Sequence, residues 1–111
     1  MKTIYLFLLL SVSMTSNLAL AGWGAIAYNS YTGTTSESHG YNSYGDAANS
    51  ALYACGGGCA IMAWENNNCI ALATGNGRWG EAHGYDNAND ATAAAINQCG
   101  WGCEWREWAC S

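Results

Sequence analysis

The chain contains an internal repeat, and this repeat constrains its fold more than any other feature. Shifting the sequence by 44 residues aligns residues 26–66 with residues 70–110 without a gap, and 15 of these 41 positions carry the same residue. Cysteine, tryptophan and glycine are among the shared positions, a combination that chance rarely produces. Two copies are too few for an open solenoid. We therefore expect the two halves to pack face to face or to share one sheet.

The residue pattern of each copy predicts two strands joined by a tight turn. A short apolar segment opens the copy, a Thr-Gly or Asn-Gly pair follows, and a segment of alternating character comes next. These segments are residues 25–28 and 35–42 in the first copy and residues 70–73 and 79–86 in the second.

A helix follows in each copy, with a capping residue at Ser43 or Asn87 and an acid three residues later. Small residues recur at every fourth position, which lets a helix lie close to a sheet. Gly-rich segments at residues 55–59 and 99–103 end the helices and lead into a last strand. The predicted class is α+β: two tandem ββαβ repeats, residues 25–66 and 69–110, that form a mainly antiparallel sheet with two Ala-rich helices packed on one face.

The first 21 residues have the pattern of a secretory signal peptide. Lys2 precedes the apolar run of residues 4–10, and Ala19-Leu20-Ala21 is typical of a cleavage site. Cleavage after Ala21 leaves residues 22–111 as a single two-repeat domain. The apolar run is shorter than the ~20 residues of a membrane span, so no membrane insertion is expected. The predicted location is periplasmic or secreted.

Six cysteines in so short an exported chain indicate a disulfide framework. Four of them are equivalent between the copies, while Cys69 and Cys110 have no counterpart. The simplest pairing joins Cys55 to Cys59, Cys99 to Cys103 and Cys69 to Cys110, although six cysteines allow other pairings. The four CxxxC cysteines could instead bind zinc, but export favours their oxidation.

Several segments together resemble a known bacterial family. They are the opening WGAIAY, the Ala-rich helix that ends in cysteine, the strand CAIMAW, the following N-x-C-x-A-L-A and the terminal W-x-C-S. These segments are similar to the family catalogued as domain of unknown function 4189, over nearly all of residues 22–111. The resemblance implies a small exported protein and brings no catalytic residues. The Glu-x-His-x-Tyr element is not expected across that family.

That element, Glu37-x-His39-x-Tyr41, recurs as Glu81-x-His83-x-Tyr85. On a strand its three side chains share one face, because side chains alternate. Small residues occupy the other face, so the element should point away from the helices. Two His and two Glu side chains could hold a metal ion such as zinc. The plainer interpretation is a polar sheet face on which Glu and His pair, and no metal or cofactor is predicted.

Six tryptophans are many for so short a chain. Trp79 shares the face of Glu81, and we expect Trp64 and Trp108 to lie on the same aromatic, acidic platform. Such a platform suits stacking on sugars or binding a protein. The alternative is that tryptophans enlarge a small core.

The net charge and the absence of enzyme motifs limit the classes of function that the sequence supports. Without the leader the chain keeps two arginines against eight acidic residues, a net charge of −6, which disfavours nucleic acid. No Ser-His-Asp elbow, phosphate loop or HExxH is present, so no enzyme is predicted. We expect a binding module that holds a cationic protein, as an inhibitor would, or alternatively cell-wall glycan. The expected binding residues are Trp79, Glu81, His83, Tyr85, Glu37, His39, Tyr41, Trp64 and Trp108.

Overall fold

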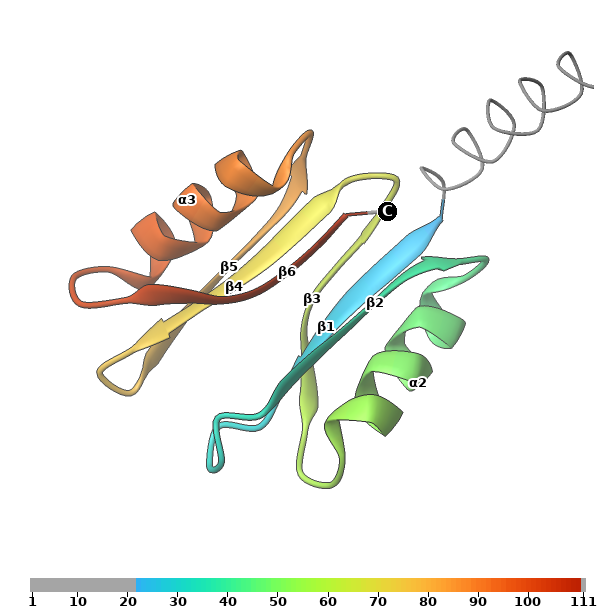
Figure 1. Ribbon diagram of the computed structural model, residues 1–111, viewed down its shortest axis with the longest axis horizontal. Coiled ribbons are helices and arrows are strands. Elements are labelled where there is room, and N and C mark those ends of the chain that lie inside the picture. Colours follow the sequence, from blue (N-terminus) through green and yellow to red (C-terminus); the bar gives the residue numbers. More distant parts are fainter. Residues whose placement is uncertain (1–21, 111) are drawn as a thin grey trace, which may run out of the picture.

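The computed structural model describes residues 22–110, and the predicted signal peptide, residues 1–21, lies outside them. Figure 1 shows the order of the elements, which is strand, strand, helix, strand, followed by the same four again. The first four are β1 (Trp23–Tyr28), β2 (Thr35–Tyr41), α2 (Tyr44–Cys55) and β3 (Ala60–Asn66). The next four are β4 (Cys69–Gly75), β5 (Arg78–Tyr85), α3 (Ala88–Cys99) and β6 (Glu104–Cys110). No helix among these residues is long and apolar enough to cross a membrane.

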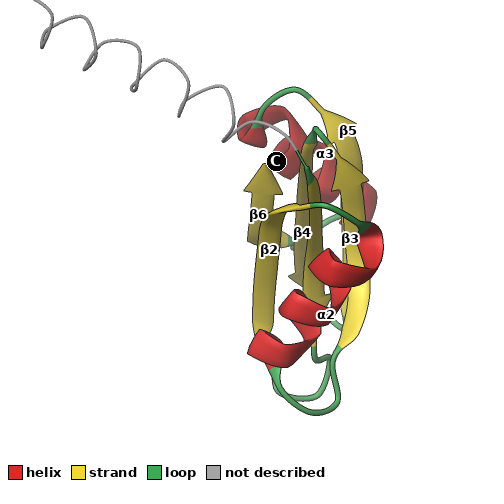
Figure 2. Ribbon diagram, turned by 90° about the vertical axis from the view of Figure 1, so that its right-hand side faces the viewer, coloured by secondary structure: helices red, strands yellow, loops and turns green. Residues whose placement is uncertain are grey.

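The strands form two sheets of three antiparallel strands, and the α+β class is confirmed. Sheet A has the order β2-β1-β3 and sheet B the order β5-β4-β6. The expectation of one sheet with both helices on one face is wrong. Each sheet has its own helix, and the two helices cover opposite outer sides with both sheets between them (Figures 1 and 2).

The central strands explain why two sheets form. Four consecutive residues of β1 and five of β4 are buried, so these segments are buried on both faces of their strands. One face receives a helix, and the other must be covered as well. Ile26, Ile70 and Leu72 are the largest fully buried side chains and fill the space between the sheets, together with Ala63 and Ala109.

The helix-covered faces are built from smaller residues. Ala47 and Ala51 of α2 pack on Ala25 and Ala27, and Ala91 and Ala95 of α3 pack on the matching face of sheet B. The approach is close: a Cβ on Gly80 would overlap backbone atoms of α3. Small residues are therefore required on both sides of these contacts.

Both helices begin as predicted. The Ser43 hydroxyl accepts a hydrogen bond from the Asp46 backbone N–H at 3.1 Å. The Asn87 side chain accepts one from the Asp90 N–H at 2.8 Å. Capping of this kind satisfies a backbone donor that has no partner inside the helix.

The structure contains the three disulfides of the simplest pairing. Cys55–Cys59 and Cys99–Cys103 each join a helix end to the strand that follows. Cys69–Cys110 joins the start of β4 to the end of β6 across neighbouring strands. No free cysteine remains within residues 22–110, so the alternative zinc site has no thiolates there.

Candidate functional site

The sheet face that was expected to be an open platform is covered by the other sheet. Glu37 pairs with Ile26, and Glu81 pairs with Leu72, so both glutamates point toward the opposite sheet from edge strands. Trp64 and Trp108 pair instead with Ala25 and Ala71, whose side chains face the helices. The predicted platform is therefore divided between two faces of each sheet.

The two tyrosines of the repeated element do not share the face of its Glu and His. The register of β1 with β2 shifts near Gly40, which has a φ of 79°. Beyond this bulge Tyr41 turns toward α2, where its hydroxyl lies 2.9 Å from the Ser50 hydroxyl. A bulge reverses the alternation of side chains, and a glycine within a strand is its usual signal. The assumption of strict alternation was wrong here, and Gly84 marks the same shift before Tyr85.

Five of the six tryptophans do not enlarge the core. Alanine, isoleucine, leucine and cysteine make up its buried hydrophobic side chains, and only Trp23 packs against it, while the other five tryptophans are exposed. These are Trp64, Trp79, Trp101, Trp105 and Trp108. Exposed aromatic rings that lie together usually mark a binding surface, and Trp105 and Trp108 line one cleft.

The sheets meet along two edges, and side chains fill one of them. At the β3–β5 edge the His83 ring stacks on Trp64, with 6.3 Å between ring centroids and 7° between planes. Its nitrogens lie 3.8 Å from a Glu65 oxygen and 3.5 Å from a Glu81 oxygen. The His83 ring, the Trp64 indole and these two carboxylates fill this edge, which we call the closed edge.

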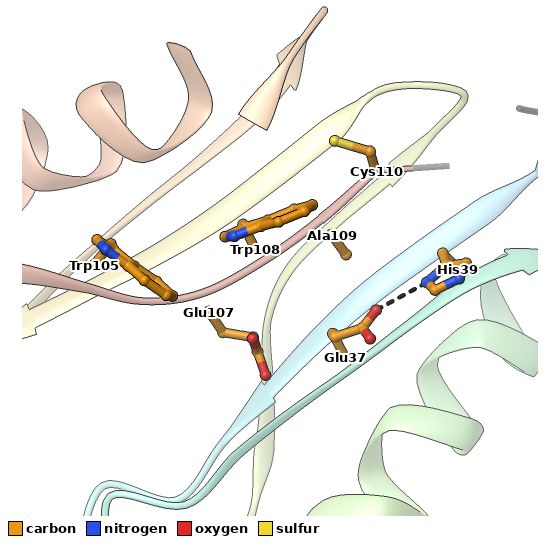
Figure 3. A pocket seen from close by; sticks show the side chains of 7 residues that line it. All are labelled: Glu37, His39, Trp105, Glu107, Trp108, Ala109 and Cys110. Atoms are coloured by element: carbon orange, nitrogen blue, oxygen red, sulfur yellow. Dashed lines mark hydrogen bonds and ion pairs between the residues drawn. The ribbon is translucent and has the colours of Figure 1, made fainter. Parts of the chain in front are cut away.

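The β2–β6 edge holds an open cleft of about 350 Å³. Figure 3 shows the side chains that line it, with the carboxylate of Glu107 projecting from β6 toward the strand that carries Glu37. His39 Nδ1 lies 3.0 Å from Glu37 Oε1. Ala109 occupies the position that aligns with Glu65 at the closed edge. The lining residues are Glu37, His39, Trp105, Glu107, Trp108, Ala109 and Cys110.

The carboxyl group of Glu107 has a raised pKa in this cleft. Partial burial raises the pKa of its carboxyl, and the negative charge of Glu37 raises it further. Hydrogen bonds from the Trp108 backbone and the Thr35 side chain oppose this rise, as does the charge of Arg106. The Arg106 guanidinium donates a hydrogen bond to the Gly33 carbonyl in the β1–β2 turn. The cleft thus places two carboxylates near each other where a positive charge would be favourable.

The raised pKa of Glu107 predicts a pH dependence of stability. The protonated carboxyl stabilises the fold below its ordinary value of 4.5, and this contribution is lost as the pH rises through the folded-state value. Glu107→Gln carries no charge at any pH. Its free energy of unfolding relative to wild type should therefore increase from about pH 4 to about pH 7. Urea unfolding at several pH values measures this difference, and a constant difference would contradict the raised pKa.

The structure separates the two histidines that were considered as joint metal ligands. His39 lies at the β2–β6 edge, while His83 lies at the β3–β5 edge on the other side of the sandwich. Within residues 22–110 no three His, Cys, Asp or Glu side chains are arranged to hold a metal ion. A metal site shared between the copies does not fit this geometry.

Sequence reasoning missed two residues of the cleft, Trp105 and Glu107. Both belong to β6, and neither has an identical partner in the first copy, where Ile61 and Ala63 align. These two residues could have been noticed in the sequence because they differ from the residues aligned with them in the first half. Trp79, by contrast, lies on β5 and is not among the residues that line this cleft.

Fold and site together define a small disulfide-bonded α+β sandwich with an acidic, aromatic cleft at one edge. The sequence profile of the family described as "Domain of unknown function (DUF4189)" matches residues 23–110, and the chain belongs to that family. The resemblance seen in the sequence motifs is thereby confirmed.

A solved structure shares the fold. The NMR structure of Rv1813c from Mycobacterium tuberculosis is 24% identical and matches with a TM-score of 0.63, covering 83% of this chain and 76% of that chain. At this identity the likeness shows the fold alone. Among curated proteins no match to the chain was found.

Proposed function

We propose that this protein is an exported, non-enzymatic binding module of the bacterial envelope or extracellular space, and that its β2–β6 cleft holds a basic side chain of a cationic protein. The proposed location is periplasmic or secreted, after cleavage behind Ala21. Three disulfides support an oxidising compartment. They also support a preorganised surface, which lowers the entropy cost of binding.

One observation carries the proposal: the two edges of the sandwich differ in what fills them. The closed edge contains an aromatic ring, two carboxylates and the His83 ring between them. The open edge also contains tryptophans, two carboxylates and an imidazole, but here His39 lies beside Glu37 and the cleft keeps free volume. A guanidinium or ammonium group from a partner would fit this volume, pair with the two carboxylates and pack against the indole rings.

The charge of the whole domain supports the same partner class. Eight acidic residues and only two arginines occur among residues 22–110. A strongly negative surface attracts a cationic protein and accelerates its association, with an effect that weakens as salt is added.

We also propose that the two ββαβ units, residues 25–66 and 69–110, are copies of one repeat within a single domain. The aligned positions and the repeated element order support this proposal. If it is correct, substitutions at equivalent core positions should cost similar amounts of stability.

The cleft proposal predicts the effect of neutralising its carboxylates. Glu37→Gln with Glu107→Gln should weaken binding of lysozyme, used as a cationic probe, by at least about tenfold at low salt, because charged groups are lost from the cleft. The matched control is Asp86→Asn with Glu104→Gln, which changes the net charge equally outside the cleft. Titration calorimetry at low and moderate salt measures both.

A second pair of variants separates the cleft from general aromatic exposure. Trp105 and Trp79 are 53% and 55% exposed, but only Trp105 lines the cleft. Trp105→Ala should weaken lysozyme binding, and Trp79→Ala should leave it unchanged. The cleft would be refuted as the binding site if each cleft variant lost no more affinity than its control. Absence of saturable lysozyme binding by the wild-type protein would refute it as well.

A further inference from the structure

A second cavity, of about 430 Å³, lies at the end of sheet A where β1 begins and β2 and β3 end. It shares no residue with the β2–β6 cleft, and none of its side chains is charged at neutral pH. Its lining residues are Gly22, Trp23, Gly40, Tyr41, Asn42, Asn66 and Asn67. Two aromatic rings and three amides in a concave site of this size are typical of small-molecule recognition.

The aromatic side chains of this cavity are held in place. Tyr41, Trp23 and Asn66 are neighbours in one row across the three strands of sheet A. The Trp23 ring lies edge-on to Tyr44 of α2, with 6.2 Å between centroids. The hydrogen bond between the Tyr41 and Ser50 hydroxyls fixes the second ring. The two rings are thus preorganised rather than free to rotate.

The amides of the cavity keep unused hydrogen-bonding capacity. The Gly22 N–H donates to Asn67 Oδ1 at 2.7 Å, and the Asn67 N–H donates to the Gly22 carbonyl at 2.9 Å. These bonds fix the Asn67 side chain and leave its NH2 group available. Within residues 22–110, the side-chain amides of Asn42 and Asn66 make no hydrogen bond to the protein. Each free amide offers both a donor and an acceptor.

Two glycines, Gly22 and Gly40, are among the lining residues. A Cβ at Gly22 would lie 2.9 Å from backbone atoms of Gly40, so the two glycines allow the chains to touch. A Cβ at Gly40 would meet nothing within 4 Å, so this position opens into free space.

We propose that this cavity binds a neutral saccharide unit of a glycan chain. The C–H face of a pyranose would pack on Trp23 or Tyr41, as apolar groups do on aromatic rings. Its hydroxyl groups, which both donate and accept, would be matched by the amides of Asn42, Asn66 and Asn67. None of the lining side chains is charged, and cleavage behind Ala21 leaves the Gly22 amino group as a further hydrogen-bond donor at the cavity. A neutral saccharide carries no charge for salt to screen, so its binding should be insensitive to salt.

The second half of the chain supplies an internal control. Asp86 and Cys110 stand at the positions that align with Asn42 and Asn66, so the amide set is not repeated. Tyr85 aligns with Tyr41, and both are 37% exposed. Tyr85→Ala therefore removes a ring of equal exposure at a position outside the proposed sugar site.

The test is a saccharide titration of the oxidised protein, produced from the full chain with its own leader and followed by NMR. The probes are tri-N-acetylchitotriose, cellotriose and maltotriose up to about 10 mM, the range in which single-sugar sites bind. We expect at least one to shift the side-chain amide signals of Asn66 and Asn67 and the Trp23 indole signal, at both low and high salt. Asn66→Ala should weaken that binding about tenfold, the effect of losing one or two hydrogen bonds.

Two results would overturn the proposal. One is no saturable shift with any of the three probes while the variant and wild-type spectra show intact folds. The other is a binding loss in Tyr85→Ala that equals the loss in Tyr41→Ala. Lysozyme binding to the β2–β6 cleft is measured independently, so failure of one site leaves the other proposal standing.

Discussion

Replacing Cys69 and Cys110 together with alanine should lower the free energy of unfolding by about 4 kcal/mol. The bridge joins residues 41 positions apart, so its removal releases a long loop in the unfolded chain. A loss of this size shifts the melting temperature of a domain this small by roughly 15–30 °C. Thermal unfolding followed by circular dichroism, under non-reducing conditions, measures the change.

The short bridges provide the comparison for this prediction. Cys99 and Cys103 are 4 positions apart, so replacing both with alanine should cost only about 2 kcal/mol. Both double variants remove two buried or half-buried sulfurs, and they differ mainly in the length of the loop that they open. An equal loss in the two variants would contradict the loop-entropy explanation.

Ile26→Ala and Ile70→Ala should each lower the free energy of unfolding by about 2–5 kcal/mol. Ile26 is 0% and Ile70 is 1% exposed, and both fill the layer between the sheets. Ile26, Ile70 and Leu72 are the largest fully buried side chains among residues 22–110, so a cavity at either isoleucine removes much of what holds the sheets together. Urea unfolding of the two variants gives the values.

The same two variants test the proposed repeat. Ile26 and Ile70 occupy aligned positions, so their costs should agree within about 1 kcal/mol. Ile61→Ala, at a half-buried position beside α2, should cost clearly less than either. Losses that differ widely between Ile26→Ala and Ile70→Ala would argue against equivalent environments in the two units.

The local elements of this fold follow from the sequence because short-range interactions specify them. Ser43 and Asn87 begin the helices as expected, since each cap satisfies a backbone donor a few residues away. Gly56 and Gly100 end them through backbone bonds to Leu52 and Ile96. Such bonds need no information from the rest of the chain.

The division into two sheets was harder to predict. The uninterrupted apolar runs of β1 and β4 are typical of strands buried on both faces, and this signal was present in the sequence. The sheet arrangement that follows from such a strand depends on which part of the protein covers its second face. Periodicity alone does not state whether the other copy pairs edge to edge or packs face to face, because both arrangements bury the same residues.

The candidate cleft was predictable only in part. Glu37, His39 and Trp108 were expected binding residues and do line it. Trp105 and Glu107 were missed because their role depends on β6 of one sheet lying beside β2 of the other. Tyr41 and Tyr85 were placed on the wrong face because a one-residue bulge reverses side-chain alternation.

The family, the order of strands and helices, the helix caps and a disulfide pairing that agrees with the structure all follow from the amino-acid sequence. These features rest on neighbouring residues or on a comparison of the two copies. The packing of the whole chain is needed to show that the sheets face each other, that His83 stacks on Trp64 at one edge, and that the other edge holds a cleft. These contacts join residues far apart in the chain, and their geometry exists only once both cores are packed.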